Sequence, residues 1–120
     1  LEQKMPPTIV PIPLSQKRLR QRGYNQVHEI LTRTVKNTHS LKPQLLRRTR
    51  ETPPQTSLTR AARLQNMHTA FVVPIHTQQK ISKVHILIVD DVATTGATLQ
   101  AAKTAFLPHV ASVTCLALAH

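Results

Sequence analysis

The chain has 120 residues, which is enough for one covered α/β core and too few for two independent domains. It has a single cysteine, only 2% aromatic residues and a formal net charge of +11. One cysteine excludes an internal disulfide, and the absence of an apolar stretch of roughly 18 residues excludes a membrane-spanning helix. We therefore expect a soluble, cytoplasmic protein that does not insert into membranes.

The positive charge is concentrated in the N-terminal half. Residues 1–66 contain 13 Lys and Arg against three Glu, whereas residues 67–120 contain three Lys against Asp90 and Asp91. Such an excess attracts polyanions, which include nucleic acids, membrane surfaces and highly phosphorylated small molecules. Charge alone does not choose among them.

The first half of the chain is predicted to contain short elements between basic segments. Residues 8–14 are predicted to form a strand that is ended by Pro11 and Pro13, and residues 18–23 a basic connector. An amphipathic helix of about three turns is predicted from Tyr24 on, because the following apolar positions have helical spacing: Val27, Ile30, Leu31, Thr34 and Val35.

The middle of the chain gives weaker signals. Residues 42–50 are predicted to form a strand that runs out into a basic loop. Ser57 is a candidate N-cap for a helix at Leu58–Met67. Ala70–Val73 is predicted to be a short strand, and the polar segment His76–Ser82 a turn.

The last third of the chain has the clearest pattern. Val84–Val89, continuously apolar over residues 86–89, is typical of a strand buried on both faces of a parallel sheet. Ala97–Leu107 is predicted to be a helix that is broken before Pro108, and Val110–Ala119 a closing strand. Strand, helix and strand form a βαβ unit, so we expect an α/β fold with a mostly parallel sheet flanked by helices.

A candidate ligand site follows the buried strand. Asp90 and Asp91 come directly after it, where open α/β sheets bind their ligands. Carboxylates accept hydrogen bonds from ribose hydroxyls and can hold Mg²⁺ that neutralises a diphosphate. The next residues are small or hydroxylated and begin a helix, as a phosphate-binding loop requires; they are Ala93, Thr94, Thr95, Gly96, Ala97 and Thr98. Gly96 is expected to remove a Cβ that would block the close approach of an anion.

Simpler interpretations apply to several of these residues. The two aspartates could cap the next helix, although that leaves the Thr-Thr-Gly sequence unexplained. Single arginines are often solvated surface charges. Cys115 lies in an apolar strand and is expected to be buried and inert. Tyr24 is expected to pack at a helix start rather than to stack on a base.

Three segments resemble one protein family. They are residues 11–26 (PIPLSQKRLRQRGYNQ), residues 45–66 (LLRRTRETPPQTSLTRAARLQN) and residues 86–98 (ILIVDDVATTGAT). The last is similar to the phosphoribosyl-diphosphate (PRPP) binding motif of type I phosphoribosyltransferases, and the set resembles the ComF (competence protein F, GntX-like) family of that superfamily. The resemblance implies a single phosphoribosyltransferase-like domain over residues 1–120. It also implies a truncated N-terminus, since family members usually carry a zinc ribbon with paired cysteines there.

The resemblance further implies roles for individual residues. Asp90 and Asp91 would hold the ribose hydroxyls with Mg²⁺ as cofactor, and residues 93–98 the 5′-phosphate. A basic hood at Arg47–Asn66 would close over the departing diphosphate, with Gln55 and with Arg48, Arg60 and Arg63 as its catalytic cations.

Two functions remain open at this point. The first is a phosphoribosyltransferase that transfers phosphoribose from PRPP to a nucleobase-like or amine acceptor, linked by the family resemblance to DNA uptake in natural competence. The second is a non-enzymatic module on a transferase scaffold that handles single-stranded DNA together with the competence machinery. We hypothesise that Arg18, Arg20 and Arg22 extend the anion-binding rim and contact nucleic acid. Without interleaved aromatic residues, such binding should be electrostatic and steeply salt-dependent.

Overall fold

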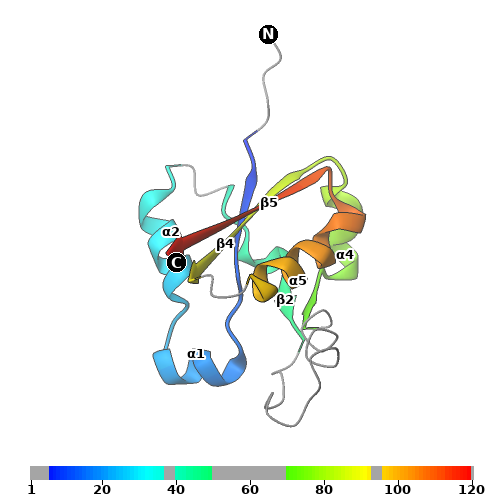
Figure 1. The fold of residues 1–120 in the computed structure, drawn as a ribbon. Coiled ribbons are helices and arrows are strands. Elements are labelled where there is room, and N and C mark those ends of the chain that lie inside the picture. The colour runs from blue at the N-terminus through cyan, green and yellow to red at the C-terminus, as the bar shows by residue number, and fades with distance from the viewer. Residues whose placement is uncertain (1–5, 37–39, 50–69, 93–95, 120) are drawn as a thin grey trace.

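The computed structural model describes residues 6–36, 40–49, 70–92 and 96–119 (Figure 1). The helix predicted at Leu58–Met67 lies outside the described residues. None of the helices within these ranges is both long and apolar enough to span a membrane.

A parallel sheet forms the centre of the described fold. Its strands are β1 (Thr8–Pro11), β4 (His85–Val92) and β5 (Ser112–Ala119), and β4 lies between the other two. The register places Val10 of β1 opposite Ile88 of β4. The central place of β4 explains the continuous apolar run in its sequence, because an interior strand is covered on both sides. The predicted buried strand is confirmed.

Helices cover the two faces of this sheet (Figure 1). Ile86 and Ile88 belong to a core that also contains residues of α5 (Ala97–Phe106). The intervening Leu87 and the following Val89 pack in a second core with α2 (Gln26–Thr34). Side chains of a strand alternate between its faces, so this division is what the pleat of β4 requires. The predicted α/β class, with a mostly parallel sheet flanked by helices, is confirmed.

A second, two-stranded antiparallel sheet packs against the α5 side. It pairs β2 (Arg47–Arg48) with β3 (Phe71–Val72), and Phe71 joins the same core as α5. The prediction of one strand over residues 42–50 is only partly right. Pro43–Leu45 forms a 3-10 turn instead, because proline fits the first position of a helical turn and cannot donate to a sheet.

Two short helices replace segments that were predicted to be irregular. The basic connector is α1 (Gln16–Arg22), whose N–H at Arg18 donates to the Ser15 hydroxyl and which ends at Gly23, with a left-handed φ of 82°. The predicted turn at residues 76–82 is mostly helical: α4 (Ile75–Gln78) follows Pro74 and continues into a 3-10 turn at Gln79–Ile81. Only the capping residues Ser15 and Gly23 indicate α1 in the sequence, because none of its seven residues is buried and no apolar periodicity marks the helix.

The helix predicted from Tyr24 is confirmed as α2, but its outward face differs from the expectation. Val27 and Leu31 are buried against the sheet. Ile30 is 37% exposed and Tyr24 is 53% exposed, so Tyr24 does not pack into the body of the protein as predicted. The apolar stripe with Val27 and Leu31 therefore packs on the sheet, while Ile30 and the preceding Tyr24 are exposed in the described fold.

Cys115 lies on β5, on the side that packs against α5. It is half-buried, and its Sγ donates to the carbonyl oxygen of Leu99 over 3.8 Å. Burial raises the pKa of this thiol, while the charge of Lys103 acts in the opposite direction. The thiol form is therefore favoured, but the expectation of a buried cysteine is only partly right, because β5 leaves Cys115 partly exposed.

Candidate functional site

The parallel strands place their carboxyl ends at one edge of the sheet, and the two aspartates lie at this edge. Asp90 and Asp91 are within the last three residues of β4, which continues to Val92 because it pairs with β5 as far as Ala119. The strand was predicted to end at Val89. The aspartates are therefore held by strand hydrogen bonding instead of standing in a loop.

The two carboxylates lie close enough to each other for the Asp91 side chain to raise the pKa of Asp90. Asp90 follows the alternation of Ile86 and Ile88, and its nearby cation is Arg48 of β2. The Oδ2 atom of Asp91 is 3.8 Å from Nη1 of Arg22 at the end of α1. Each carboxylate thus has an arginine from a different part of the chain.

Asp90 is the more strongly perturbed of the pair. Its side chain is half-buried, and its Oδ1 accepts a hydrogen bond from the backbone N–H of Asp91 over 2.8 Å. Burial raises the pKa of Asp90 above its ordinary value. The N–H of Asp91 and the guanidinium of Arg48 oppose that rise, while the Asp91 carboxylate adds to it. An ionised Asp90 is therefore stabilised by any ligand that brings hydroxyl donors or a cation.

Arg48 is anchored in the fold. Its Nη1 donates to the carbonyl oxygen of Pro13 over 3.4 Å, and its guanidinium lies 5.1 Å from the centre of the Phe71 ring. Both contacts keep a positive charge on the Asp90 side of the sheet. The other residues assigned to a basic hood lie outside the described residues; they are Gln55, Arg60 and Arg63.

The start of α5 completes the edge. Gly96 is the N-cap residue, with a φ of 77°, and Ala97 and Thr98 begin the helix. A Cβ added at Gly96 would meet no other atom within 4 Å, so within the protein the glycine is required by its backbone conformation and not by space. The positive end of the helix dipole lies beyond the aspartates along the chain. Ala93, Thr94 and Thr95, predicted to bind phosphate, lie outside the described residues.

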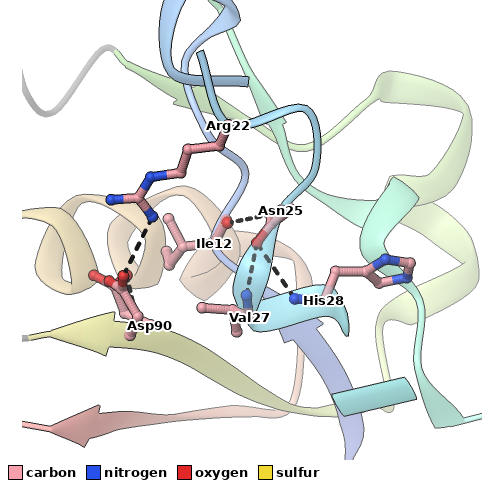
Figure 2. Close-up of polar contacts among 7 residues, drawn as sticks. Ile12, Arg22, Asn25, Val27, His28 and Asp90 are labelled. Atoms are coloured by element: carbon pink, nitrogen blue, oxygen red, sulfur yellow. Dashed lines mark hydrogen bonds and ion pairs between the residues drawn. The ribbon is translucent and has the colours of Figure 1, made fainter. Parts of the chain in front are cut away.

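Asn25 ties the basic helix region to the sheet. Its Nδ2 donates to the carbonyl oxygen of Ile12 over 3.0 Å, and its Oδ1 accepts from the N–H groups of Val27 and His28 over 3.1 and 3.3 Å (Figure 2). One side chain therefore caps α2 and attaches the start of this helix to Ile12, which directly follows β1. The role of Asn25 was not predicted from the sequence, although asparagine before an amphipathic helix is a favoured N-cap.

The three predicted nucleic-acid-binding arginines lie on α1 but have different surroundings. Arg22 reaches Asp91. Arg18 and Arg20 are exposed on the same helix. Helix α1 thus links the aspartate edge to an open basic surface.

The donor set fits a magnesium ion that arrives with its substrate. Within the described ranges no group of three or more His, Cys, Asp or Glu side chains could enclose a metal ion. Mg²⁺ usually keeps several waters and uses one or two carboxylates together with substrate phosphates. Asp90 and Asp91 are the residues that would hold it.

Comparison with known proteins identifies relatives but no family model and no solved structure that match the chain. It is 34% identical over 97 residues to DNA utilization protein YhgH of Escherichia coli strain K12, and 32% identical over 98 residues to competence protein F of Haemophilus influenzae strain Rd. The chain is a homologue of competence protein F. Each match covers 80% of this chain and about two fifths of the relative's length, 41% for YhgH and 42% for competence protein F. The resemblance to the ComF family seen in the sequence is thereby confirmed.

Proposed function

We propose that this chain binds PRPP, together with Mg²⁺, at the edge formed by Asp90, Asp91 and the start of α5. The observation that carries the proposal is the position of the half-buried Asp90, next to Asp91 at the carboxyl end of the central strand and followed by the start of α5. Because the chain spans about two fifths of its relatives' length, the activity of the whole protein is part of the proposal.

In this proposal the edge recognises both ends of a phosphoribose. The carboxylates of Asp90 and Asp91 accept hydrogen bonds from the ribose hydroxyls, and the N-terminus of α5 with residues 93–98 receives the 5′-phosphate. Mg²⁺, when bound, neutralises the negative charge of the diphosphate. The charge of Arg48 lowers the pKa of Asp90 and so favours its ionised form.

Transfer of the phosphoribosyl group would follow from the same arrangement. The bond from C1 of the ribose to the diphosphate oxygen breaks, its electron pair leaves with the diphosphate, and a nucleophilic acceptor forms the new bond to C1. The positive charge that develops on the ribose in the transition state is stabilised by nearby carboxylates, and the leaving diphosphate by cations. Arg48, Arg60 and Arg63 are the proposed cations, and the acceptor is a nucleobase-like or amine compound.

A titration with PRPP tests the binding step. A ligand that binds only the folded state raises its stability, by about 2.7 kcal/mol at a concentration of 100 times Kd. We expect PRPP to raise Tm in the presence of Mg²⁺, and the Asp90→Asn/Asp91→Asn variant to lose that rise. Glu29→Gln removes an exposed carboxylate of α2 and serves as the control that keeps it. No rise for the wild type at millimolar PRPP would refute the proposal.

A second function rests on a different observation. Helix α1 buries none of its residues and carries Lys17, Arg18, Arg20 and Arg22 with no acidic residue in its first turn. We infer that this helix contacts the phosphates of single-stranded DNA, and the names of the relatives, DNA utilization protein and competence protein F, support a link with DNA uptake.

The salt dependence of oligonucleotide binding tests this second function. Each phosphate contact with single-stranded DNA contributes about 0.7 to the slope of log K against log salt concentration. An Arg18→Gln/Arg20→Gln variant should therefore lower that slope by about 1.4. The control Lys80→Gln/Lys83→Gln removes two exposed cations from the segment between α4 and β4. It should leave the slope unchanged. Equal slopes for the α1 variant and the wild type would refute a role of α1.

A further inference from the structure

A shallow groove of about 540 Å³, widely open to solvent, lies at the outer face of α2. Its volume lies in the range of about 300–1,000 Å³ that is usual for ligand sites. Four of its lining residues occupy positions i, i+3, i+4 and i+7 of the helix, which form one stripe, and the fifth precedes the helix. The lining residues are Tyr24, Gln26, Glu29, Ile30 and Arg33.

The walls of this groove suit a flat, mainly apolar ring. Tyr24 and Ile30 expose apolar surface there, although the sheet already takes the other stripe of α2. Glu29 and Arg33 form an ion pair of 3.7 Å across one helical turn, so their charges offset each other. Gln26 offers both a hydrogen-bond donor and an acceptor. The groove therefore combines an aromatic face with a neutral polar edge.

The surroundings of the groove point to a ligand that also carries negative charge. Tyr24 follows α1 directly after Gly23, whose left-handed conformation ends that helix. The basic, fully exposed α1 thus stands next to an aromatic side chain in the sequence and in the fold. Bases flanked by phosphates have the same combination, because a single strand offers an apolar ring and a charged group in every nucleotide.

We propose that the Tyr24 groove binds a base of a single-stranded nucleic acid whose phosphates lie on α1. This inference rests on the second function given above and adds to it a site for the base. Tyr24 stacks on the ring, and Gln26 contacts its polar edge. Stacking of this kind tolerates any base, since every base has a π face.

The chain contains its own probe for this contact. Tyr24 is its only tyrosine and it has no tryptophan, so tyrosine fluorescence reports on this one ring. Saturation with oligothymidylate of about 20 nucleotides should quench the emission. An abasic deoxyribose-phosphate oligomer of equal length should leave the emission unchanged while still binding to α1.

Affinity measurements with labelled oligothymidylate complete the test. We expect Tyr24→Ala to weaken binding about tenfold, with an unchanged salt slope, and Tyr24→Phe to bind like the wild type. Ile75→Ala, which truncates an exposed apolar residue of α4, is the matched control and should also bind like the wild type. The same series with oligouridylate separates RNA from DNA as the source of the base. Circular dichroism and Tm verify that each variant is folded.

The possible failures are distinguishable. Wild-type affinity of Tyr24→Ala, or unquenched emission at saturating oligothymidylate, would overturn the groove assignment and leave the contact with α1 standing. An Arg18→Gln/Arg20→Gln variant with unchanged affinity and slope would overturn the second function itself. Equal competition by inorganic polyphosphate and by oligothymidylate would also overturn the base site, because polyphosphate has no ring to stack.

Discussion

The two faces of the central strand β4 are held very differently. The face with Ile86 and Ile88 packs in the larger core, which includes Phe106 of α5 and Phe71 of β3. The opposite face has a small core in which Val27 and Leu31 of α2 meet Val89. The surroundings of the two aspartates at the end of β4 differ in the same way. Position 90 continues the alternation of the densely packed face, near which Arg48 is anchored, and position 91 that of the sparsely packed face, where the partly exposed Arg22 contacts Asp91. Two adjacent residues thus have one anchored arginine, Arg48, and one partly exposed arginine, Arg22, near them.

Truncation of the two cores should show the largest difference. Phe106→Ala removes a fully buried ring and should lower the free energy of unfolding by about 3–5 kcal/mol. Leu31→Ala, on the smaller core and 8% exposed, should cost about 2–3 kcal/mol, at the lower end of the range for such substitutions. Urea unfolding measures both. A larger loss for Leu31→Ala would contradict the proposed asymmetry.

Loss of the Asn25 side chain should have the next largest effect. Asn25→Ala removes an N-cap, which costs about 1 kcal/mol, and also the hydrogen bond to the carbonyl oxygen of Ile12. The same variant should weaken oligonucleotide binding, because α1 and Tyr24 lose their attachment to the sheet. Asn25→Asp keeps the cap but not the donor to Ile12, and so separates the two roles. If Asn25→Ala had the same free energy of unfolding and the same oligonucleotide affinity as the wild type, Asn25 would not attach α2 to the sheet.

A smaller, pH-dependent effect is expected for Asp90. Its folded pKa is raised by burial, so protonation favours the folded state, and that contribution is lost as pH rises through the folded pKa. At neutral pH the wild type therefore carries the cost of an ionised, half-buried carboxylate. Asp90→Asn should gain less than about 1 kcal/mol, since solvent screens the group, and the gain should vanish as pH falls below the ordinary range of aspartate. A difference that is independent of pH would contradict this account.

The smallest effect on stability is expected for Arg22. Its ion pair with Asp91 is 3.8 Å long and partly exposed, with both side chains more than a third accessible. Such pairs contribute about 0–1 kcal/mol. Arg22→Gln should therefore unfold almost like the wild type, and high salt should abolish the remaining difference. A large loss that persists at high salt would show that the sparsely packed face is more rigid than its contacts indicate.

The sequence predicted the C-terminal half best. The apolar run of β4 and the break at Pro108 are local signals, and local signals suffice for a central strand and the helix after it. The short helices α1 and α4 escaped because seven or four residues give too little periodicity, and only Ser15 and Gly23 marked α1. Asp90 and Asp91 were predicted as site residues from their place after a buried strand.

What the sequence could not give were contacts between distant residues. Two such contacts are the ion pair of Arg22 with Asp91 and the hydrogen bond of Arg48 to Pro13. Both join segments that are far apart in the sequence and meet only in the folded chain. The exposure of Ile30 was equally unpredictable, because this residue has the spacing of a core residue and only the fold of the described residues shows that its side chain is 37% exposed.

The contact between Arg22 and Asp91 has a consequence for regulation. The guanidinium of Arg22 contacts Asp91, and Arg22 is also part of α1, the helix proposed to contact nucleic acid. A sugar that engages Asp91 changes what holds Arg22, and phosphates that draw Arg22 away change the charge beside the sugar. If PRPP and a single strand bind as proposed, thermodynamic linkage requires the two effects to be equal: the factor by which PRPP changes the affinity for the strand is the factor by which the strand changes the affinity for PRPP.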